Sequence, residues 1–154
     1  MVNGYRHAGE VTRHLVDWVT SVVPGAPVTV SSLSDEAADR GIEIRLIAAI
    51  PRVVPLRPGH RTVALALDYL VTVRLEDPFA EHEAVSNLAF AAQGAPGFEL
   101  GTDRSVGELC RAIGLVPRAG IQLRTEARRN EVLEDVRPTV QAANGQTEVL
   151  LGAA

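Results

Sequence analysis

The chain has 154 residues, a formal net charge of -4 and a single cysteine, Cys110. A chain of this length can bury the core of one domain, which we expect to span residues 1–154, while one cysteine excludes an internal disulfide framework and a cysteine-based zinc site. All 15 basic residues are arginine, which excludes lysine chemistry, and the acidic balance argues against nucleic acid as a partner.

The N-terminal segment predicts a helix followed by a short strand. Between residues 10 and 23, four apolar residues recur at the spacing of one helix face: Val11, Leu15, Trp18 and Val22. Pro24 and Gly25 end this pattern. The following PVTVSSL predicts a short strand, and SDEAADRG predicts a polar connection or a single helical turn.

Two long alternating segments predict the main strands of a sheet. GIEIRLIAAIPR predicts a half-buried strand whose two faces carry, respectively, Ile42, Ile44, Leu46, Ala48 and Ile50, and Glu43 and Arg45. The proline-containing VVPLRPGH predicts an extended loop. RTVALALDYLVTVRL then has an apolar residue at every second position from Val63 to Leu75, so we expect it to form the central strand.

The opposite face of this central strand is smaller and partly polar. It predicts a surface covered by a helix, another subunit or water. Asp68 lies on it and needs a partner if it is buried, and Arg45 or Arg61 could serve as that partner.

The next segment predicts two helices and a strand. Asp77 and Pro78 are suited to cap and to begin a helix through DPFAEHEAVSNLAFAAQ. After a short GFELG segment, a second helix is expected over about residues 105–115, capped by Thr102 or Asp103. A further strand follows near residue 121.

The C-terminal PTVQAANGQTEVLLG predicts a β-hairpin. The pair Asn144-Gly145 favours a two-residue turn, which places Val140 opposite Val149 and Gln141 opposite Glu148. The elements together predict an α+β fold, with a largely antiparallel twisted sheet, an N-terminal helix and two further helices packed on it, and this C-terminal hairpin.

No residue pattern points to a reaction centre. His7 and His14 are two helical turns apart, too far for a shared metal site, and no further ligand completes one. Glu81, His82 and Glu83 are adjacent and point in different directions on a helix, unlike the ligands of zinc proteases. We therefore assign no catalytic, cofactor-binding or metal-binding residue, and we expect neither an enzyme nor a cofactor.

One alternative stays open from the residues alone: a small-molecule binding module or small enzyme with a crevice near Asp68 and His60. His60 lies in a predicted loop, but no nucleophilic serine or cysteine motif accompanies it. No segment is long and apolar enough to span a membrane and none has the pattern of a secretory leader, so we expect assembly in the cytoplasm and no membrane partner.

One combination of segments resembles the cap, or tail-terminator, proteins of contractile injection systems, the phage-tail-like particles of the antifeeding-prophage and virulence-cassette type. The combination is an IxIRL strand, a strand of the form LxLxYLxT, an acid-containing helix and a proline before a short strand. It is clearest over residues 42–100, and its positions are Leu65, Leu67, Tyr69, Leu70, Thr72 and Pro96.

The resemblance implies a structural subunit without catalytic chemistry. Such a subunit would form a six-membered ring at the distal end of an inner tube, end tube polymerisation and hold the last sheath layer. Our candidates for contacts with the sheath or the adjacent subunit are Arg124, Arg128, Arg129, Val140 and Val149. A terminator or connector of an ordinary bacteriophage tail is a further alternative.

Overall fold

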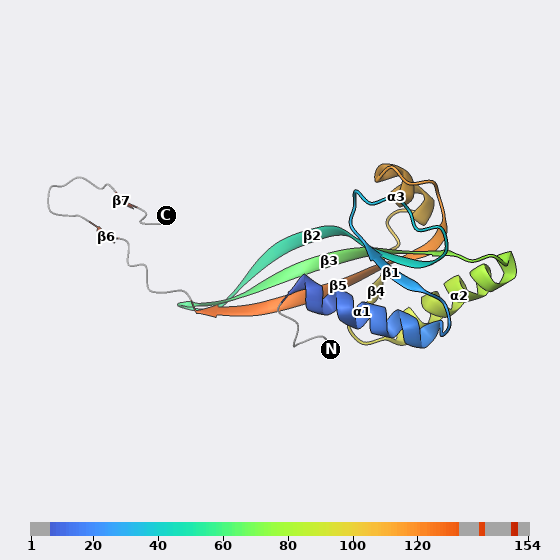
Figure 1. Cartoon of the computed structure of the whole chain (residues 1–154). Helices are drawn as coiled ribbons and strands as arrows, with labels where there is room; N and C mark the ends of the chain where they lie inside the picture. The colour runs from blue at the N-terminus through green and yellow to red at the C-terminus, as the bar shows by residue number, and fades with distance from the viewer. Residues whose placement is uncertain (1–6, 133–138, 141–148, 151–154) are drawn as a thin grey trace.

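The computed structural model describes residues 7–132, 139–140 and 149–150. These residues contain three helices, α1 (Ala8–Val22), α2 (Pro78–Gly94) and α3 (Val106–Ala112) (Figure 1). They also contain seven strands, which are β1 (Val28–Ser31), β2 (Gly41–Arg57), β3 (His60–Arg74), β4 (Glu99–Leu100), β5 (Ala119–Val132), β6 (Thr139–Val140) and β7 (Val149–Leu150). None of the helices in the described ranges is long and apolar enough to cross a membrane.

Five strands form one sheet in the order β1-β2-β3-β5-β4, so β3 lies at its centre as predicted. Strand β1 pairs with β2 in parallel, and every other pair in this sheet is antiparallel. The mixed α/β architecture, with a largely antiparallel sheet and an N-terminal helix, confirms the fold predicted from the sequence.

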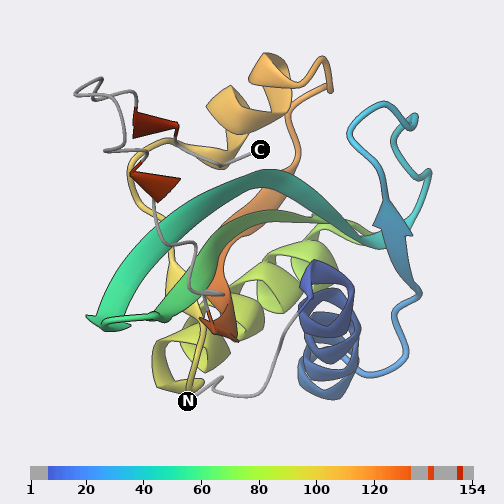
Figure 2. The ribbon, with the colours of Figure 1, turned by 90° about the vertical axis from the view of Figure 1, so that its left-hand side faces the viewer.

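The main core lies between one face of the sheet and helices α1 and α2. Figure 2 shows these two helices on one side of the sheet and α3 on the other. Helix α1 contributes Val11, Leu15 and Val19, and the predicted apolar face of β3 supplies Leu67, Tyr69, Val71 and Val73. A smaller cluster on the opposite face joins Leu70 of β3 to Leu109 and Cys110 of α3.

The helix ends show one confirmed and one wrong prediction. Asp77 caps α2 by accepting a hydrogen bond from the backbone N–H of Phe79, and Pro78 is the first helical residue. The cap of α3 is Ser105, whose hydroxyl accepts from the N–H of Glu108, and not Thr102 or Asp103.

Strand β2 is longer than predicted, because the proline-rich segment is part of it. Pro51 and Pro55 are paired opposite β3, and they are tolerated because the other side of β2 has no strand there. The chain reverses at Pro58-Gly59, where Gly59 has a φ of 77°, a conformation that favours glycine. The predicted extended loop is therefore a β-hairpin.

A register shift at Ile47 reverses which side chains of the outer half of β2 lie on each face of the sheet. The register of β2 against β3 shifts between Leu46 and Ala48. One extra residue in a strand inverts the alternation that follows it. Ala48 and Ile50, predicted to lie on the core face with Ile44, therefore lie on the opposite face beside Asp68.

Glu43 and Arg45 were expected on the polar face of a half-buried strand, but both are almost fully buried. Their ion pair joins Nε of Arg45 to Oε1 of Glu43 at 2.6 Å, with side chains 1% and 2% exposed. The loop after β1 covers them: Arg45 also donates to the carbonyls of Ser32 and Glu36, and Glu43 accepts from the N–H of Ala38. Both charges are therefore paired and hydrogen-bonded despite their burial, and the hydrogen bonds to the loop hold it against the sheet.

The C-terminal strands β6 and β7 pair antiparallel, with Val140 opposite Val149 as the hairpin prediction required. The predicted Asn144-Gly145 turn and the predicted pair of Gln141 with Glu148 lie outside the described residues.

Candidate functional site

The described part of the sheet continues beyond its body as a three-stranded arm. Strand β1 pairs with β2 only from Ile42 to Arg45, and β4 pairs with β5 only at Leu123 and Arg124. Beyond these pairs, β2, β3 and β5 run on together to a tip at residues 57–60 (Figure 1). We define the arm as residues 50–66 and 125–132; both of its outer edges lack a strand partner within the described ranges.

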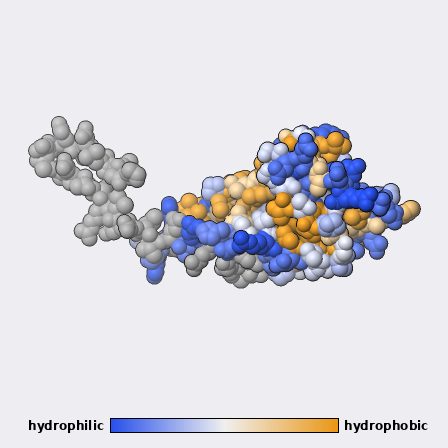
Figure 3. Space-filling model, viewed as in Figure 1, coloured by the Kyte–Doolittle hydropathy of each residue, from blue (hydrophilic) through white to orange (hydrophobic). Residues whose placement is uncertain are grey.

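The arm exposes apolar side chains. Ile50 and Val53 are each 56% exposed and Val54 is 49% exposed. Apolar residues accordingly reach the surface along the arm (Figure 3). Exposed apolar groups that gather on one element, next to unpaired strand edges, are typical of a surface that binds another protein.

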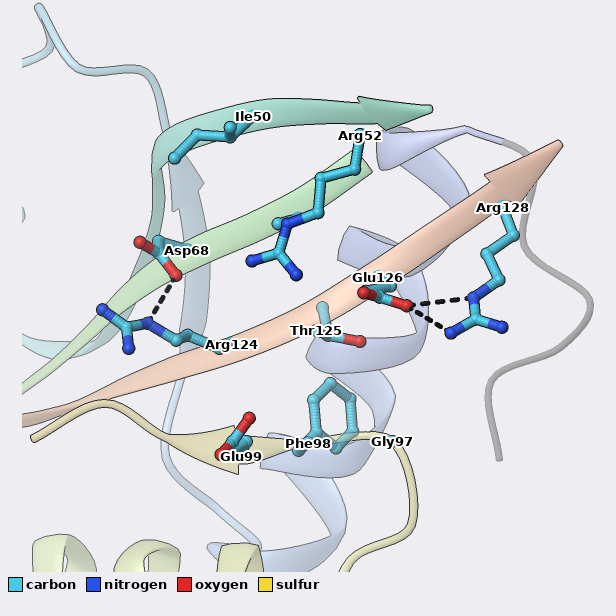
Figure 4. Close-up of a pocket in the computed structure, with 11 residues that line it drawn as sticks. Ile50, Arg52, Asp68, Gly97, Phe98, Glu99, Arg124, Thr125, Glu126 and Arg128 are labelled. Carbon is cyan, nitrogen blue, oxygen red and sulfur yellow. Dashed lines mark hydrogen bonds and ion pairs between the residues drawn. The ribbon is translucent and has the colours of Figure 1, made fainter. Parts of the chain in front are cut away.

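An open pocket of about 640 Å³ lies at the base of the arm, on the face that carries Asp68. Strand β3 contributes Ala66 and Asp68 to the lining. Figure 4 shows the larger side chains that β2 and β5 add, among them Arg52 and Arg128. The lining comprises Ile50, Arg52, Ala66, Asp68, Gly97, Phe98, Glu99, Arg124, Thr125, Glu126 and Arg128.

Asp68 forms its ion pair with Arg124. The sequence-based candidates for this partner, Arg45 and Arg61, were wrong. Nε of Arg124 lies 3.0 Å from Oδ1 of Asp68, and Nη2 lies 2.6 Å from Oδ2 of Asp103. The hydrogen bond to Asp103, followed by the charge of Asp68, raises the pKa of Arg124 above its usual value. Arg45 is taken by Glu43, and the alternation of β3 places Arg61 on the other face of the sheet.

Besides Arg124, two further arginines line the pocket: Arg128, which forms an ion pair, and Arg52, which forms none among the described residues. Nε and Nη2 of Arg128 lie 2.9 and 2.8 Å from the same carboxylate oxygen of Glu126, two residues earlier on β5. Arg52 of β2 projects over the same face (Figure 4) and has no ion-pair partner among the described residues. The exposed guanidinium of Arg52 can therefore bind an incoming carboxylate.

The three arginines proposed as contact residues do not form one cluster. Arg124 and Arg128 share the pocket face, whereas Arg129 lies on the other face and donates from Nη2 to Nδ1 of His7, at 3.0 Å. Arg129 therefore links β5 to the residue that precedes α1 through this hydrogen bond. Val140 and Val149 lie in the β6-β7 pair, and a contact role for any of these five residues stays a prediction.

The second candidate site, a crevice shared by Asp68 and His60, is not formed. Both residues lie on β3, but His60 is at the arm tip and Asp68 is eight residues further along, roughly 26 Å away in an extended strand. The described residues contain no group of three potential metal ligands, and the thiol of Cys110 is buried against α3 and β3. The pocket presents ion pairs without a nucleophile beside a base.

Ile50, Arg52 and Asp103 were missing from the sequence-based interpretation of this site. Ile50 and Arg52 reach the pocket only because of the register shift at Ile47. No glycine or other residue typical of a β-bulge predicts this shift from the sequence. Asp103 reaches Arg124 through β4 and its following loop. The spacing of Glu126 and Arg128, two residues apart on a strand, was the one visible signal, since it places both on one face.

Two solved structures share the mixed α/β fold of this chain. The first is the cryo-EM structure of the anti-feeding prophage cap, the tube-terminating cap, with a TM-score of 0.61 and 14% sequence identity over 84% of this chain and 57% of that one. The second is the sheath/tube terminator of an extracellular contractile injection system, PVC, in the extended state, with a TM-score of 0.59 and 14% identity over 83% of this chain and 58% of that one.

These likenesses establish that this chain has the fold of the two terminators. It spans somewhat more than half of the length of each. No protein-family model and no curated protein matches the sequence.

Proposed function

We propose that this chain is the cap, or terminator, subunit of a contractile injection system, assembled in the cytoplasm, and that it ends the inner tube and holds the last sheath layer. The observation that carries the proposal is the fold shared with two tube terminators over more than four-fifths of the chain. Identity of 14% fixes the fold alone, so the function rests on the fold together with the surface described above.

The arm supports this role physically. It combines exposed apolar residues with two strand edges that lack partners within the described ranges, and such edges pair readily with strands of another chain. Proline at positions 51 and 55 removes N–H donors from β2, whereas the described edge of β5 from residue 125 contains no proline. The β5 edge, with Arg124, Arg128 and Arg129 beside it, is therefore the better acceptor for a strand of tube or sheath.

A terminator that caps a symmetric tube has to match the symmetry of the tube. We propose a closed ring of six copies, with no metal, cofactor or nucleic acid in its function. Under this proposal the chain is a structural subunit and not an enzyme.

The test is the native mass of the purified protein, measured by light scattering, together with its binding to sheared tube particles. We expect a species of six chain masses, or a species that binds tube ends and blocks their further growth. A monomer that ignores tube ends would refute the terminator function. In that case a ligand screen would follow, with Asp68→Asn as the first variant.

A further inference from the structure

The tip of the arm and the beginning of helix α2 lie at opposite ends of the molecule, and α2 packs on the sheet face opposite to the open face of the arm (Figure 2). Strand β3 runs from the arm tip at His60 to Arg74, roughly 45 Å in an extended strand, and α2 begins four residues later (Figure 1). A contact between the two surfaces would therefore join different copies head to tail, which is the geometry that generates rings.

The open face of the arm is hollowed at its base by the pocket described above, and we call this hollow, together with the surface that continues it toward the tip, the trough. Ala66 of β3 lines the pocket, and Ala64 and Thr62 follow it on the same face. On the β2 side stand Ile50, Arg52 and Val54, which share one face beyond the register shift. On the β5 side stand Glu126 and Arg128. Helix α3 covers only the body end of this face, at Leu70.

Helix α2 has an outward face with two large aromatic residues. Phe79 and Phe90 are 83% and 77% exposed, although α2 already buries Ala84, Leu88 and Ala92 in the core. They are eleven residues apart, which is close to three full turns, so they share one face about 16 Å apart. Glu83 lies between them on the same face, is exposed, and has no ion-pair partner among the described residues.

The two surfaces have opposite charge. The open face of the arm carries two arginines, Arg52 and Arg128, and one glutamate, Glu126, a net charge of +1, whereas the outward face of α2 carries Glu83 between its two phenylalanines. The order along each surface also corresponds: Ile50, Arg52 and Val54 span about 13 Å of strand, and Phe79, Glu83 and Phe90 span a similar length of helix.

We propose that the trough on the arm binds the outward face of helix α2 of a second copy of this chain, with Glu83 of α2 paired to Arg52. This inference rests on the proposed function, since it supplies the contact between neighbouring subunits of the ring. We choose a second copy as the partner because α2 of this chain matches the trough in chemistry. Its exposed aromatic residues suit the apolar side chains of the trough, and its Glu83 suits Arg52.

Sedimentation velocity over a concentration series tests the contact. We expect Phe90→Ser to weaken self-association roughly thirtyfold, because exposed aromatic residues that enter a partner are the main contributors to interface affinity. Val116→Ser is the matched control: Val116 is 79% exposed but lies outside both surfaces, and its replacement is expected to change nothing. Circular dichroism checks that each variant is folded.

Charge reversal makes the test specific for the two surfaces. Glu83→Arg and Arg52→Glu are each expected to weaken self-association about tenfold, and the double variant is expected to recover most of the loss. Arg111→Glu, on the exposed side of α3, is the charge control. Recovery in the double variant, with both controls unchanged, would support the contact between α2 and the arm.

Three results would overturn the inference. They are a wild-type protein that stays monomeric at every concentration, self-association that is indifferent to these variants, and variants that self-associate normally while losing binding to sheared tube ends. The last result would assign α2 to a tube or sheath contact. Binding to tube ends is measured in parallel, so that failure of the subunit contact is distinguished from failure of the terminator function.

Discussion

The body and the arm of the sheet are built from the same three strands but have different surroundings. In the body, α1 and α2 cover one face, and α3 with the loop after β1 covers the other, so Leu67, Tyr69 and even Arg45 are almost fully buried. In the arm, Ile50 and Val54 on the face that contains Ala66 reach solvent. Most of the buried core lies in the body, whereas the arm exposes apolar side chains to solvent.

The largest expected difference between the two regions concerns their ion pairs. Arg45→Leu leaves Glu43 buried without its partner and is expected to lower the free energy of unfolding by about 3–5 kcal/mol. Arg128→Leu breaks the exposed pair with Glu126, whose side chains are 54% and 35% exposed, and is expected to cost less than about 1 kcal/mol. Urea denaturation measures both. Equal losses would contradict the division into body and arm.

Apolar truncation should show the same contrast at a somewhat smaller scale. Leu67→Ala in the body creates a cavity between the sheet and the helices and is expected to cost about 2–4 kcal/mol. Ile50→Ala removes a side chain that is already 56% exposed and is expected to change the free energy of unfolding by less than about 0.5 kcal/mol. A large loss with Ile50→Ala would mean that the monomer buries this residue.

Substitution of two glycines by alanine compares a position where an added Cβ would collide with the backbone and a position where it would meet no atom. Gly120 packs against the backbone of β3, where the Cβ of an alanine would collide with the carbonyl of Val71, so Gly120→Ala is expected to cost about 1–3 kcal/mol. Gly9, in the first turn of α1, has nothing within 4 Å of such a Cβ, and Gly9→Ala is expected to stabilise by about 0.5 kcal/mol. Thermal unfolding of the two variants should shift in opposite directions.

The smallest expected effect is a dependence of body stability on alkaline pH. Burial raises the pKa of Tyr69 above its ordinary value of 10.0, although the hydrogen bond with Thr12 acts in the opposite direction. Because the folded state retains the phenol proton, the contribution of Tyr69 is complete below pH 10 and is lost as the pH rises through the raised pKa. Tyr69→Phe should therefore show a flatter loss of stability above pH 10 in urea titrations; an unchanged slope would refute this assignment.

Much of the fold could be predicted because local chemistry agreed with the tertiary structure. The alternation in β3 identified its core face, and Asp77 with Pro78 identified the start of α2. The proline-rich half of β2 was misread as a loop, because proline disfavours inner strands but is accepted where one edge is unpaired. Whether an edge is unpaired depends on where β1 ends, which the local sequence does not specify.

The candidate site was less predictable because it depends on register. Arg124 was predicted only as a contact residue, and its partners Asp68 and Asp103 lie 56 and 21 residues away and meet it only through strand pairing. The extra residue at Ile47 moved Ile50 and Arg52 to the pocket face, and its sequence context resembles the regular strand before it.

The sequence by itself determined the class of fold, the central strand, the capped helix α2 and the absence of a recognisable catalytic motif, because periodicity and capping are properties of neighbouring residues. The tertiary structure alone decided which charges are buried, which face of β2 meets the pocket and where the three central strands continue as an arm. Those features arise from strand register and from the lengths over which β1 and β4 pair, which are set by contacts between segments far apart in the chain.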